Sequence, residues 1–257
     1  MSPDARQLCR AAYESTFRAV SGALGAHDPL QVAAGAARHV EQTVEGFRQL
    51  TGAAIDCRAG CSFCCWLRID ARAHEVLLIA RFLKNETATT PHPGGLEARI
   101  QAAAEKVAGL SYDERQAMQQ PCALLDHAGC CSVYEARPLA CRRYLSVSVE
   151  ACSAIWQGEP PEVEPEHPMI AEPGRYAANG AHNAFIAQGY DGYQYELMAA
   201  LREALADPEC EARWRLKQPA FSEAARSSTP AGFSQDEALA QLRAALAAQA
   251  EKTGKTA

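Results

Sequence analysis

The sequence predicts an all-α protein, a helical domain in which irregular cysteine-bearing loops form a metal site. Apolar residues recur at helical spacing along several segments, and no series of β-branched strands appears. Nine of the eleven cysteines fall in two short windows. The chain has 257 residues, of which 48% are hydrophobic, so it can bury a substantial core without the help of disulfide bonds.

Two long helices are predicted near the N-terminus. Ser2 and Pro3 are typical of a helix start, and the first helix is expected to run to about residue 23. Asp28 and Pro29 repeat this signal, and a second helix follows up to about residue 50. Apolar side chains three and four positions apart form one face of it, at Ala33, Ala36, Val40, Val44 and Phe47. This stripe is expected to face the core.

Several further helices are predicted along the rest of the chain. Amphipathic or helix-forming stretches cover residues 73–85, 96–110, 193–207 and 234–252. Ser111 with Glu114 forms a capping box that begins another short helix, and Ser234 with Glu237 forms a second one.

The distribution of proline and glutamate divides the chain. Residues 1–156 are predicted to be a helical domain with the cysteine-cluster metal site, whose motif core is 57–152. Residues 157–174 hold five prolines and five glutamates, which is typical of an extended acidic connector. Residues 175–257 are expected to be a C-terminal helical segment that packs on the same domain.

The cysteine windows are the strongest functional signal. The first window, "CRAGCSFCC", contains Cys57, Cys61, Cys64 and Cys65. The second contains Cys122, Cys130, Cys131, Cys141 and Cys152. Two windows of thiols that fold together are a means of building a closed thiolate cage from loops. The turn sequence "DHAG" and the stiff Pro138 in the second window favour a rigid backbone around the ligands.

Composition argues against several other functions. The formal net charge of −6 disfavours a nucleic-acid partner. No apolar run behind a basic stretch marks a secretory signal, and no window offers about 18 consecutive apolar residues for a membrane span. We therefore expect a cytoplasmic protein with no membrane partner, in which clustered thiols stay reduced and bind metal.

The paired windows resemble a known family. The first window followed by C-x(8)-C-S-V-Y-x2-R-P-x2-C-R is similar to the YkgJ-type cysteine-cluster family, a zinc- or iron-chelating CxxCxxCC domain. The resemblance covers residues 57–152. It implies a metal or iron–sulfur site built from Cys57, Cys61, Cys64, Cys65, Cys122, Cys131, Cys141 and Cys152. Cys130 is an additional thiol, so whether Cys130 or Cys131 is the ligand stays open. Relatives of this family include flagellin lysine methylases, which implies a role in modification of another protein.

The donor atoms narrow the choice of metal. Soft thiolates select zinc, copper(I) or iron–sulfur clusters, and four cysteines satisfy either a tetrahedral zinc ion or a [4Fe–4S] cluster. Because eight thiols exceed one such site, we expect either two metals or one cluster with spare thiols. An iron–sulfur cluster, most of all [4Fe–4S], is favoured over zinc. Five arginines near the windows could offset the thiolate charge, namely Arg58, Arg68, Arg137, Arg142 and Arg143.

Three functional interpretations remain open. In the first, the metal site supports redox chemistry or modification of a protein substrate or redox partner. In the second, a structural zinc site makes the protein an interaction module without turnover. In the third, C-x3-C-x2-C is the cluster motif of a radical SAM enzyme, although the helical segments after it argue against that fold. Whether the protein is an enzyme stays open, and Cys9 and Cys210 are expected to be ordinary buried residues.

Overall fold

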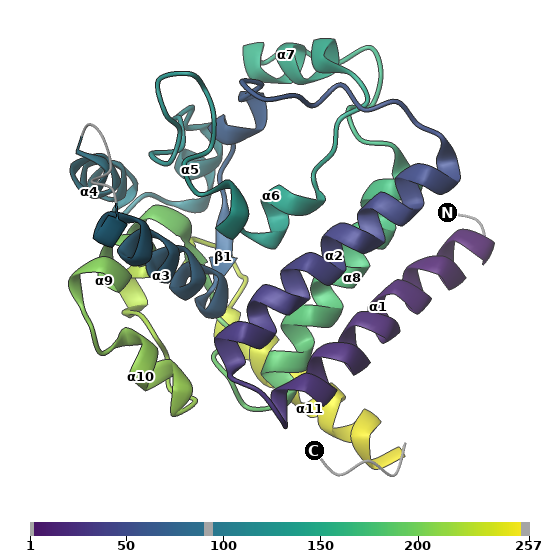
Figure 1. Ribbon diagram of the computed structural model, residues 1–257, viewed down its shortest axis with the longest axis vertical. Helices are drawn as coiled ribbons and strands as arrows, with labels where there is room; N and C mark the ends of the chain where they lie inside the picture. The colour runs from purple at the N-terminus through teal and green to yellow at the C-terminus, as the bar shows by residue number, and fades with distance from the viewer. Residues whose placement is uncertain (1–2, 90–94, 253–257) are drawn as a thin grey trace.

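The computed structural model describes residues 3–89 and 95–252. Three long helices lie side by side in it, α1 (Pro3–Leu24), α2 (Pro29–Thr51) and α8 (Pro168–Ala187), and each contacts the other two (Figure 1). The predicted N-cap Ser2 lies outside the described residues. Asp28 caps α2 as expected, since its carboxylate accepts hydrogen bonds from the backbone of Leu30 and Gln31 at 3.1 Å each.

A second group of helices packs beside this bundle. The helices α3 (Ala73–Thr89) and α4 (Leu96–Val107) both contact α9 (Leu197–Ala206), and α10 (Cys210–Arg215) lies against α3 and α9. The C-terminal helix α11 (Gln235–Lys252) contacts α8. A continuous core fills the interior, and its largest fully buried side chains include Leu30, Val40, Phe185, Tyr195 and Trp214.

The remaining helices are short, and three of them contain cysteines of the two windows. They are the 3-10 helices η1 (Phe63–Trp66), η2 (Tyr134–Ala136) and η3 (Glu223–Ala225), and the helices α5 (Tyr112–Ala117), α6 (Leu139–Arg143) and α7 (Val149–Gln157). In Figure 1, α5, α6 and α7 lie at the upper end of the molecule. The predicted capping box of Ser111 and Glu114 is present at the start of α5.

The prediction of an all-α fold is confirmed, with one small sheet. The strands β1 (Asp70–Arg72) and β2 (Gln194–Glu196) are antiparallel, with Asp70 opposite Glu196. The predicted helix over 193–207 therefore begins only at Leu197, because the backbone before it pairs with β1. None of the described helices is both long enough and apolar enough to cross a membrane.

The acidic loop before α8 is shorter than the connector that the sequence predicts. The helix α8 begins at Pro168, so residues 168–174 of the predicted connector are helical. Pro168 is at the start of the helix, where proline is tolerated because its missing N–H would have no intrahelical partner. The loop before it is also anchored, since the backbone N–H of Val147 donates to the carbonyl of Pro165 at 2.8 Å.

A close approach between α1 and α8 depends on a glycine. A Cβ atom on the buried Gly180 would lie 2.5 Å from the carbonyl oxygen of Tyr13 and 3.2 Å from the backbone nitrogen of Phe17. Backbone atoms cannot move aside as a flexible side chain can, so this position requires the absence of a side chain for the two helices to pack.

We expect Gly180→Ala to lower the free energy of unfolding by about 1–3 kcal/mol, because the extra methyl group pushes α1 and α8 apart. The matched control is Gly46→Ala, an exposed position in α2 with no atom within 4 Å of the added Cβ. That change should raise the free energy of unfolding by up to about 1 kcal/mol, because alanine favours the helix. Urea denaturation measures both, and an equal response of the two variants would contradict the packing described.

Candidate metal centre

Backbone hydrogen bonds join the first cysteine window to the second. The window follows α2, which ends at Gly52 in the left-handed conformation with φ 65°. The N–H of Asp56 donates to the carbonyl of Ser146 at 2.9 Å, and the Asp56 carboxylate accepts from the N–H of Val149 at 3.2 Å. The N–H of Cys122 donates to the carbonyl of Cys65 at 2.8 Å. The start and the end of the first window are therefore both tied to the second.

Two glycine turns also bring the windows together. Gly60 has φ 82° and Gly129 has φ 74°, values that favour glycine. A Cβ on Gly129 would lie 3.1 Å from the carbonyl oxygen of Gly60, so the two turns touch through their backbones. A side chain at Gly129 would both strain its own backbone and push against the first window.

The second window is built around the predicted turn. The Asp126 carboxylate accepts hydrogen bonds from the backbone of Ala128 and Cys130 at 2.8 Å each, which shapes the turn. Leu125 and Cys131 then form an isolated antiparallel bridge. Further along, the N–H of Cys141 donates to the carbonyl of Pro138 at 3.0 Å in the first turn of α6. These contacts fix the backbone at three of the cysteines in this window.

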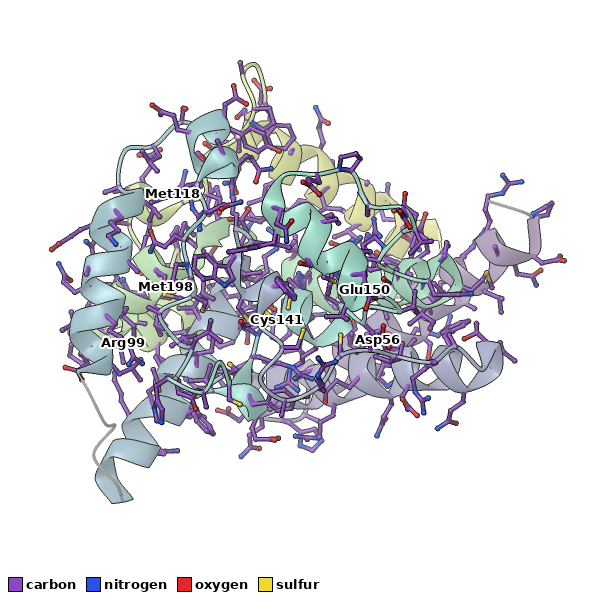
Figure 2. The ribbon with its side chains drawn as sticks, turned by 90° about the horizontal axis from the view of Figure 1, so that it is seen from above. Asp56, Arg99, Met118, Cys141, Glu150 and Met198 are labelled. Atoms are coloured by element: carbon purple, nitrogen blue, oxygen red, sulfur yellow. The ribbon has the colours of Figure 1, made fainter. Side chains whose placement is uncertain are left out.

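The thiols of both windows form one electrostatically connected group. Cys64 is at its centre, because it acts on the thiols of Cys57, Cys122, Cys131 and Cys141. Its neighbours also include Cys65, through a side-chain hydrogen bond. Cys61 and Cys152 join the group through Cys57. Figure 2 shows Cys141 near the middle of the molecule with other sulfur atoms beside it. We name these eight residues the cysteine cluster: Cys57, Cys61, Cys64, Cys65, Cys122, Cys131, Cys141 and Cys152.

Burial keeps several of these thiols protonated when no metal is bound. It raises the pKa of Cys122 to about 11 and raises the pKa of Cys131 and Cys141 above the ordinary value. The hydrogen bond with Cys65, together with burial, raises the pKa of Cys64. A bound metal favours thiolates, so metal binding must release protons from this cluster.

Ser146, in the loop before α7, forms a hydrogen bond with a cysteine side chain of each window. The N–H of Ser146 donates to the Cys57 sulfur at 3.2 Å, and the Cys152 thiol donates to the Ser146 hydroxyl at 3.1 Å. Donors that point at sulfur stabilise negative charge on it and, in iron–sulfur proteins, tune the reduction potential. Ser146 therefore orients one cysteine of each window.

Three cysteines lie apart from the cluster. The Cys130 thiol contacts the carbonyl of Ala128 at 4.0 Å, within its own turn. The adjacent Cys131 thiol interacts electrostatically with Cys64 of the first window. Cys9 and Cys210 are buried on α1 and α10, away from both windows. The structure thus brings together the eight residues that the resemblance implies, while their role as ligands stays a prediction.

Two of the predicted arginines interact with the cluster, Arg143 through the Cys141 thiol and Arg137 through Cys64 and Cys131. The positive charge of Arg137 lowers the pKa of Cys64 and Cys131, although less than the effects that raise them. Its guanidinium group lies 3.7 Å from the ring centroid of Tyr134 and 3.0 Å from the Glu41 carboxylate. Arg137 therefore supplies part of the positive charge that would offset a cage of thiolates.

A cavity of about 460 Å³ reaches the cluster from the surface. Cys64 and Cys152 contribute to its lining together with Tyr144. Aromatic and apolar side chains form much of the remaining wall, including Phe63, Trp66, Met118, Ile155 and Trp156. Trp156 contacts Phe63 and Trp66 with ring centroids 6.0 and 5.7 Å away. The cluster is thus in contact with a space large enough for part of a substrate or partner.

The donor set fits a thiolate-bound metal, but it is more widely spaced than one tetrahedral site. Four thiolates around one zinc ion would lie about 3.8 Å apart, given zinc–sulfur bonds of about 2.3 Å. Among the described residues, no three cysteine sulfurs lie within 4.8 Å of one another. Such a group of three ligand atoms is formed instead by His74, Glu75 and His182. Sequence reasoning missed this group, because His182 is far from the other two in the chain and the three form no spacing motif.

Comparison with known proteins supports metal binding by the loop region. Residues 56–158 match the family CxxCxxCC, described as "Putative zinc- or iron-chelating domain". The matched segment contains both windows, so the resemblance noted in the sequence is confirmed over these residues. No curated protein and no solved structure matches the chain. The family description supports zinc or iron binding and does not distinguish between a single ion and a cluster.

Replacing a member of the cysteine cluster with serine should lower the bound metal, because a hydroxyl is a poor substitute for a thiolate. We expect this loss, with a lower melting temperature, for Cys61→Ser, Cys64→Ser, Cys122→Ser and Cys141→Ser. Cys130→Ser is the matched control for Cys131→Ser, and Cys9→Ser and Cys210→Ser should also keep full metal content. Elemental analysis per folded chain is the measurement. Equal losses from cluster and control variants would mean that the site is misplaced.

The metal-free, reduced protein should become less stable as the pH rises above about 9. The pKa values of the Cys122 and Cys141 thiols are raised in the folded state, so the unfolded chain loses these protons at a lower pH. This loss stabilises the unfolded state relative to the folded state. Urea denaturation between pH 7 and pH 10 measures this decline. Cys122→Ala should weaken the dependence of the free energy of unfolding on pH, and Cys130→Ala should leave it unchanged. If stability declines equally in both variants, the raised pKa of Cys122 is not the cause of the decline.

Proposed function

We propose that the cysteine cluster holds an iron–sulfur centre and that this centre serves electron transfer to, or modification of, another protein. The observation that carries the proposal is the cavity of about 460 Å³ whose lining includes Cys64 and Cys152. A purely structural metal site has its ligands closed off from solvent, whereas a functional centre needs a route for a substrate or an electron partner.

The number and spacing of the thiols favour a cluster over one zinc ion. Eight cysteines exceed the four that a tetrahedral ion uses. They are also held apart by three different backbone environments, namely the loop at Cys57, the 3-10 helix at Cys64 and the helix at Cys141. An iron–sulfur cluster supplies one-electron chemistry and is held by thiolates spread over a larger volume than a single ion needs.

The surface around the cavity suits a protein partner. Leu67, Ile155 and Trp156 are exposed large apolar side chains, and all three line the cavity. Exposed apolar groups gathered at one place, with aromatic members, are typical of interaction sites. Tyr144 lies in the same wall and interacts with the Cys152 side chain, so a polar group is present between the cluster and the cavity.

A structural zinc site is the second candidate, and one observation favours it. The touching turns of Gly60 and Gly129, together with the hydrogen bond from Cys122 to Cys65, show how closely the windows are joined. A metal bound between them would hold α2, η1 and α7 in place without any turnover. This alternative predicts a colourless, redox-inactive protein.

The test is metal and acid-labile sulfide analysis, with an absorption spectrum, on protein purified without oxygen. We expect iron and sulfide in similar amounts and a broad visible absorption that bleaches on reduction with dithionite. Cys64→Ser should lose this absorption, and Cys130→Ser, the matched control, should retain it. Zinc without sulfide and without visible absorption would replace the proposal with the structural alternative.

A further inference from the structure

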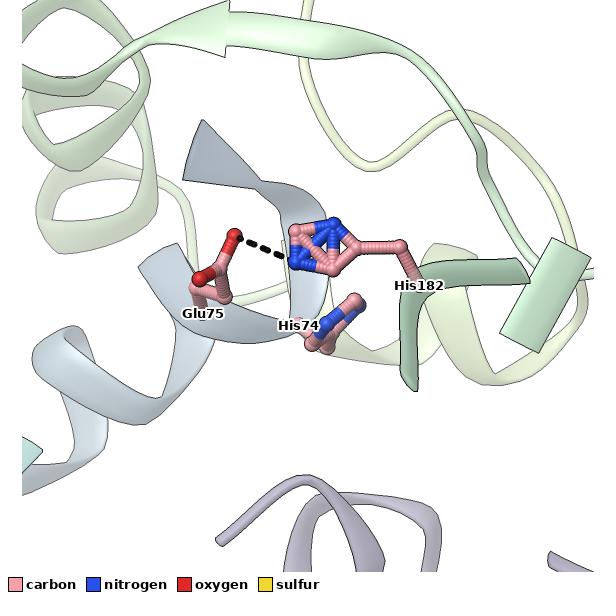
Figure 3. A group of neighbouring side chains, drawn as sticks. All are labelled: His74, Glu75 and His182. Atoms are coloured by element: carbon pink, nitrogen blue, oxygen red, sulfur yellow. Dashed lines mark ion pairs between the residues drawn. The ribbon is translucent and has the colours of Figure 1, made fainter. Parts of the chain in front are cut away.

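A buried group of two histidines and one glutamate lies apart from the cysteine cluster. His74 and Glu75 are at the start of α3, and His182 is on α8 (Figure 3). One ligand atom from each of the three residues lies within 4.8 Å of the other two. His182 Nε2 and Glu75 Oε2 are 3.7 Å apart. Two separate elements of the fold therefore converge on this point.

Both histidines present a nitrogen that the protein does not use. Among the residues that the structure describes, neither His74 Nδ1 nor His182 Nε2 has a hydrogen-bond partner. His74 is 3% exposed, and buried polar atoms are nearly always paired with protein, water or an ion. Burial lowers the pKa of His74 to about 3 and also lowers the pKa of His182, so both rings are neutral and carry a free lone pair at neutral pH.

Two of the three side chains, His74 and Glu75, are held in place by their surroundings, and the His182 ring meets the His74 ring edge-on with the centroids 5.5 Å apart. The His74 ring stacks on Phe185 with the centroids 4.3 Å apart and an interplanar angle of 14°. The Glu75 carboxylate accepts hydrogen bonds from the backbone of Leu139 at 2.7 Å and of Arg72 at 2.6 Å. Each oxygen keeps a second lone pair. The ligands are thus oriented in advance, as metal sites require.

We propose that His74, Glu75 and His182 bind a divalent transition metal ion, zinc or iron(II), at a site independent of the cysteine cluster. Two imidazoles and one carboxylate are a ligand set of catalytic zinc sites and of non-haem iron sites, and they leave coordination positions open. Ligand atoms around a tetrahedral ion lie about 3.4 Å apart, given metal–nitrogen bonds of about 2.1 Å. The 3.7 Å pair needs only a small closing movement to reach this distance.

The charges around the group permit a cation. The positive charge of the buried Arg72 interacts with Glu75 and would repel a bound cation. The charge of Arg142 also acts on Glu75. Arg72 in turn interacts with Asp70 and Asp191, which offset its charge. Asp70 also pairs with Arg68 at 3.0 Å, and burial raises the pKa of Glu75, so a bound cation would replace the proton that burial favours on this carboxyl group.

A second cavity gives access to this group. It has a volume of about 290 Å³, and its lining includes His74 and Glu75. Arg137 and Arg142 line it as well, and both form ion pairs with Glu41, at 3.0 and 2.7 Å. The cavity therefore reaches two of the three proposed ligands.

The test uses His182→Leu, which removes Nε2 without adding a polar atom, and His27→Leu, an exposed matched control. Anaerobically purified protein is incubated with cobalt(II) chloride, desalted, and analysed for total metal per folded chain. The parent and His27→Leu should each hold one equivalent more than His182→Leu. The extra cobalt should lack the thiolate-to-metal charge-transfer absorption that binding to cysteine produces. Equal metal content in all three proteins would overturn the proposal and assign the space to a water molecule.

Cobalt X-ray absorption of the loaded parent needs no variant and decides the case if His182→Leu does not fold. A nitrogen and oxygen shell with imidazole scattering supports the site, and a shell of sulfur alone overturns it. Cys64→Ser separates this proposal from the iron–sulfur assignment, because loss of the cysteine centre should leave the histidine-bound cobalt unchanged.

Discussion

The contact between the two cysteine windows is the constraint on which the rest of the site depends. The chain returns to the first window after more than two helices, and the contact is made by backbone groups: Cys122 to Cys65, and Asp56 to Ser146. Backbone hydrogen bonds set the register of the loops before any metal is present. A metal centre made from separate loops needs such an arrangement, since the thiols would otherwise be held only by the ion.

Burial of the thiols determines how readily they lose their protons. Partial burial of the Cys122 and Cys141 thiols favours their protonated form and raises the free energy of the empty thiolate cage. A metal bound directly by these thiolates would remove that penalty, and folding of the loops would then be linked to metal capture. The nearby charge of Arg137 acts in the same direction as the metal, because it also favours thiolates.

Local signals in the sequence predicted much of this structure. Asp28 before Pro29 and the capping box at Ser111 define helix starts by contacts within one turn, so they can be read without knowing the fold. The helix start at Leu197 could not be read in this way, because it depends on pairing with residues 70–72 far along the chain. The choice between Cys130 and Cys131 as a ligand has the same limit, because it depends on which of the two thiols meets the other window, and the sequence spacing does not distinguish adjacent residues. The group at His74 and His182 depends on the contact between α8 and the first residues of α3, which no sequence spacing indicates.

The central claim is that thiols from both windows hold one metal centre. Residue-resolved alkylation tests it most directly, by comparing the reactivity of each cysteine toward iodoacetamide in metal-loaded and chelator-treated protein, with peptide mass spectrometry as the readout. The account predicts that metal protects Cys61 and Cys64 of the first window together with Cys122 and Cys141 of the second, while Cys130 reacts equally in both states. Protection confined to one window, or equal reactivity with and without metal, would contradict it.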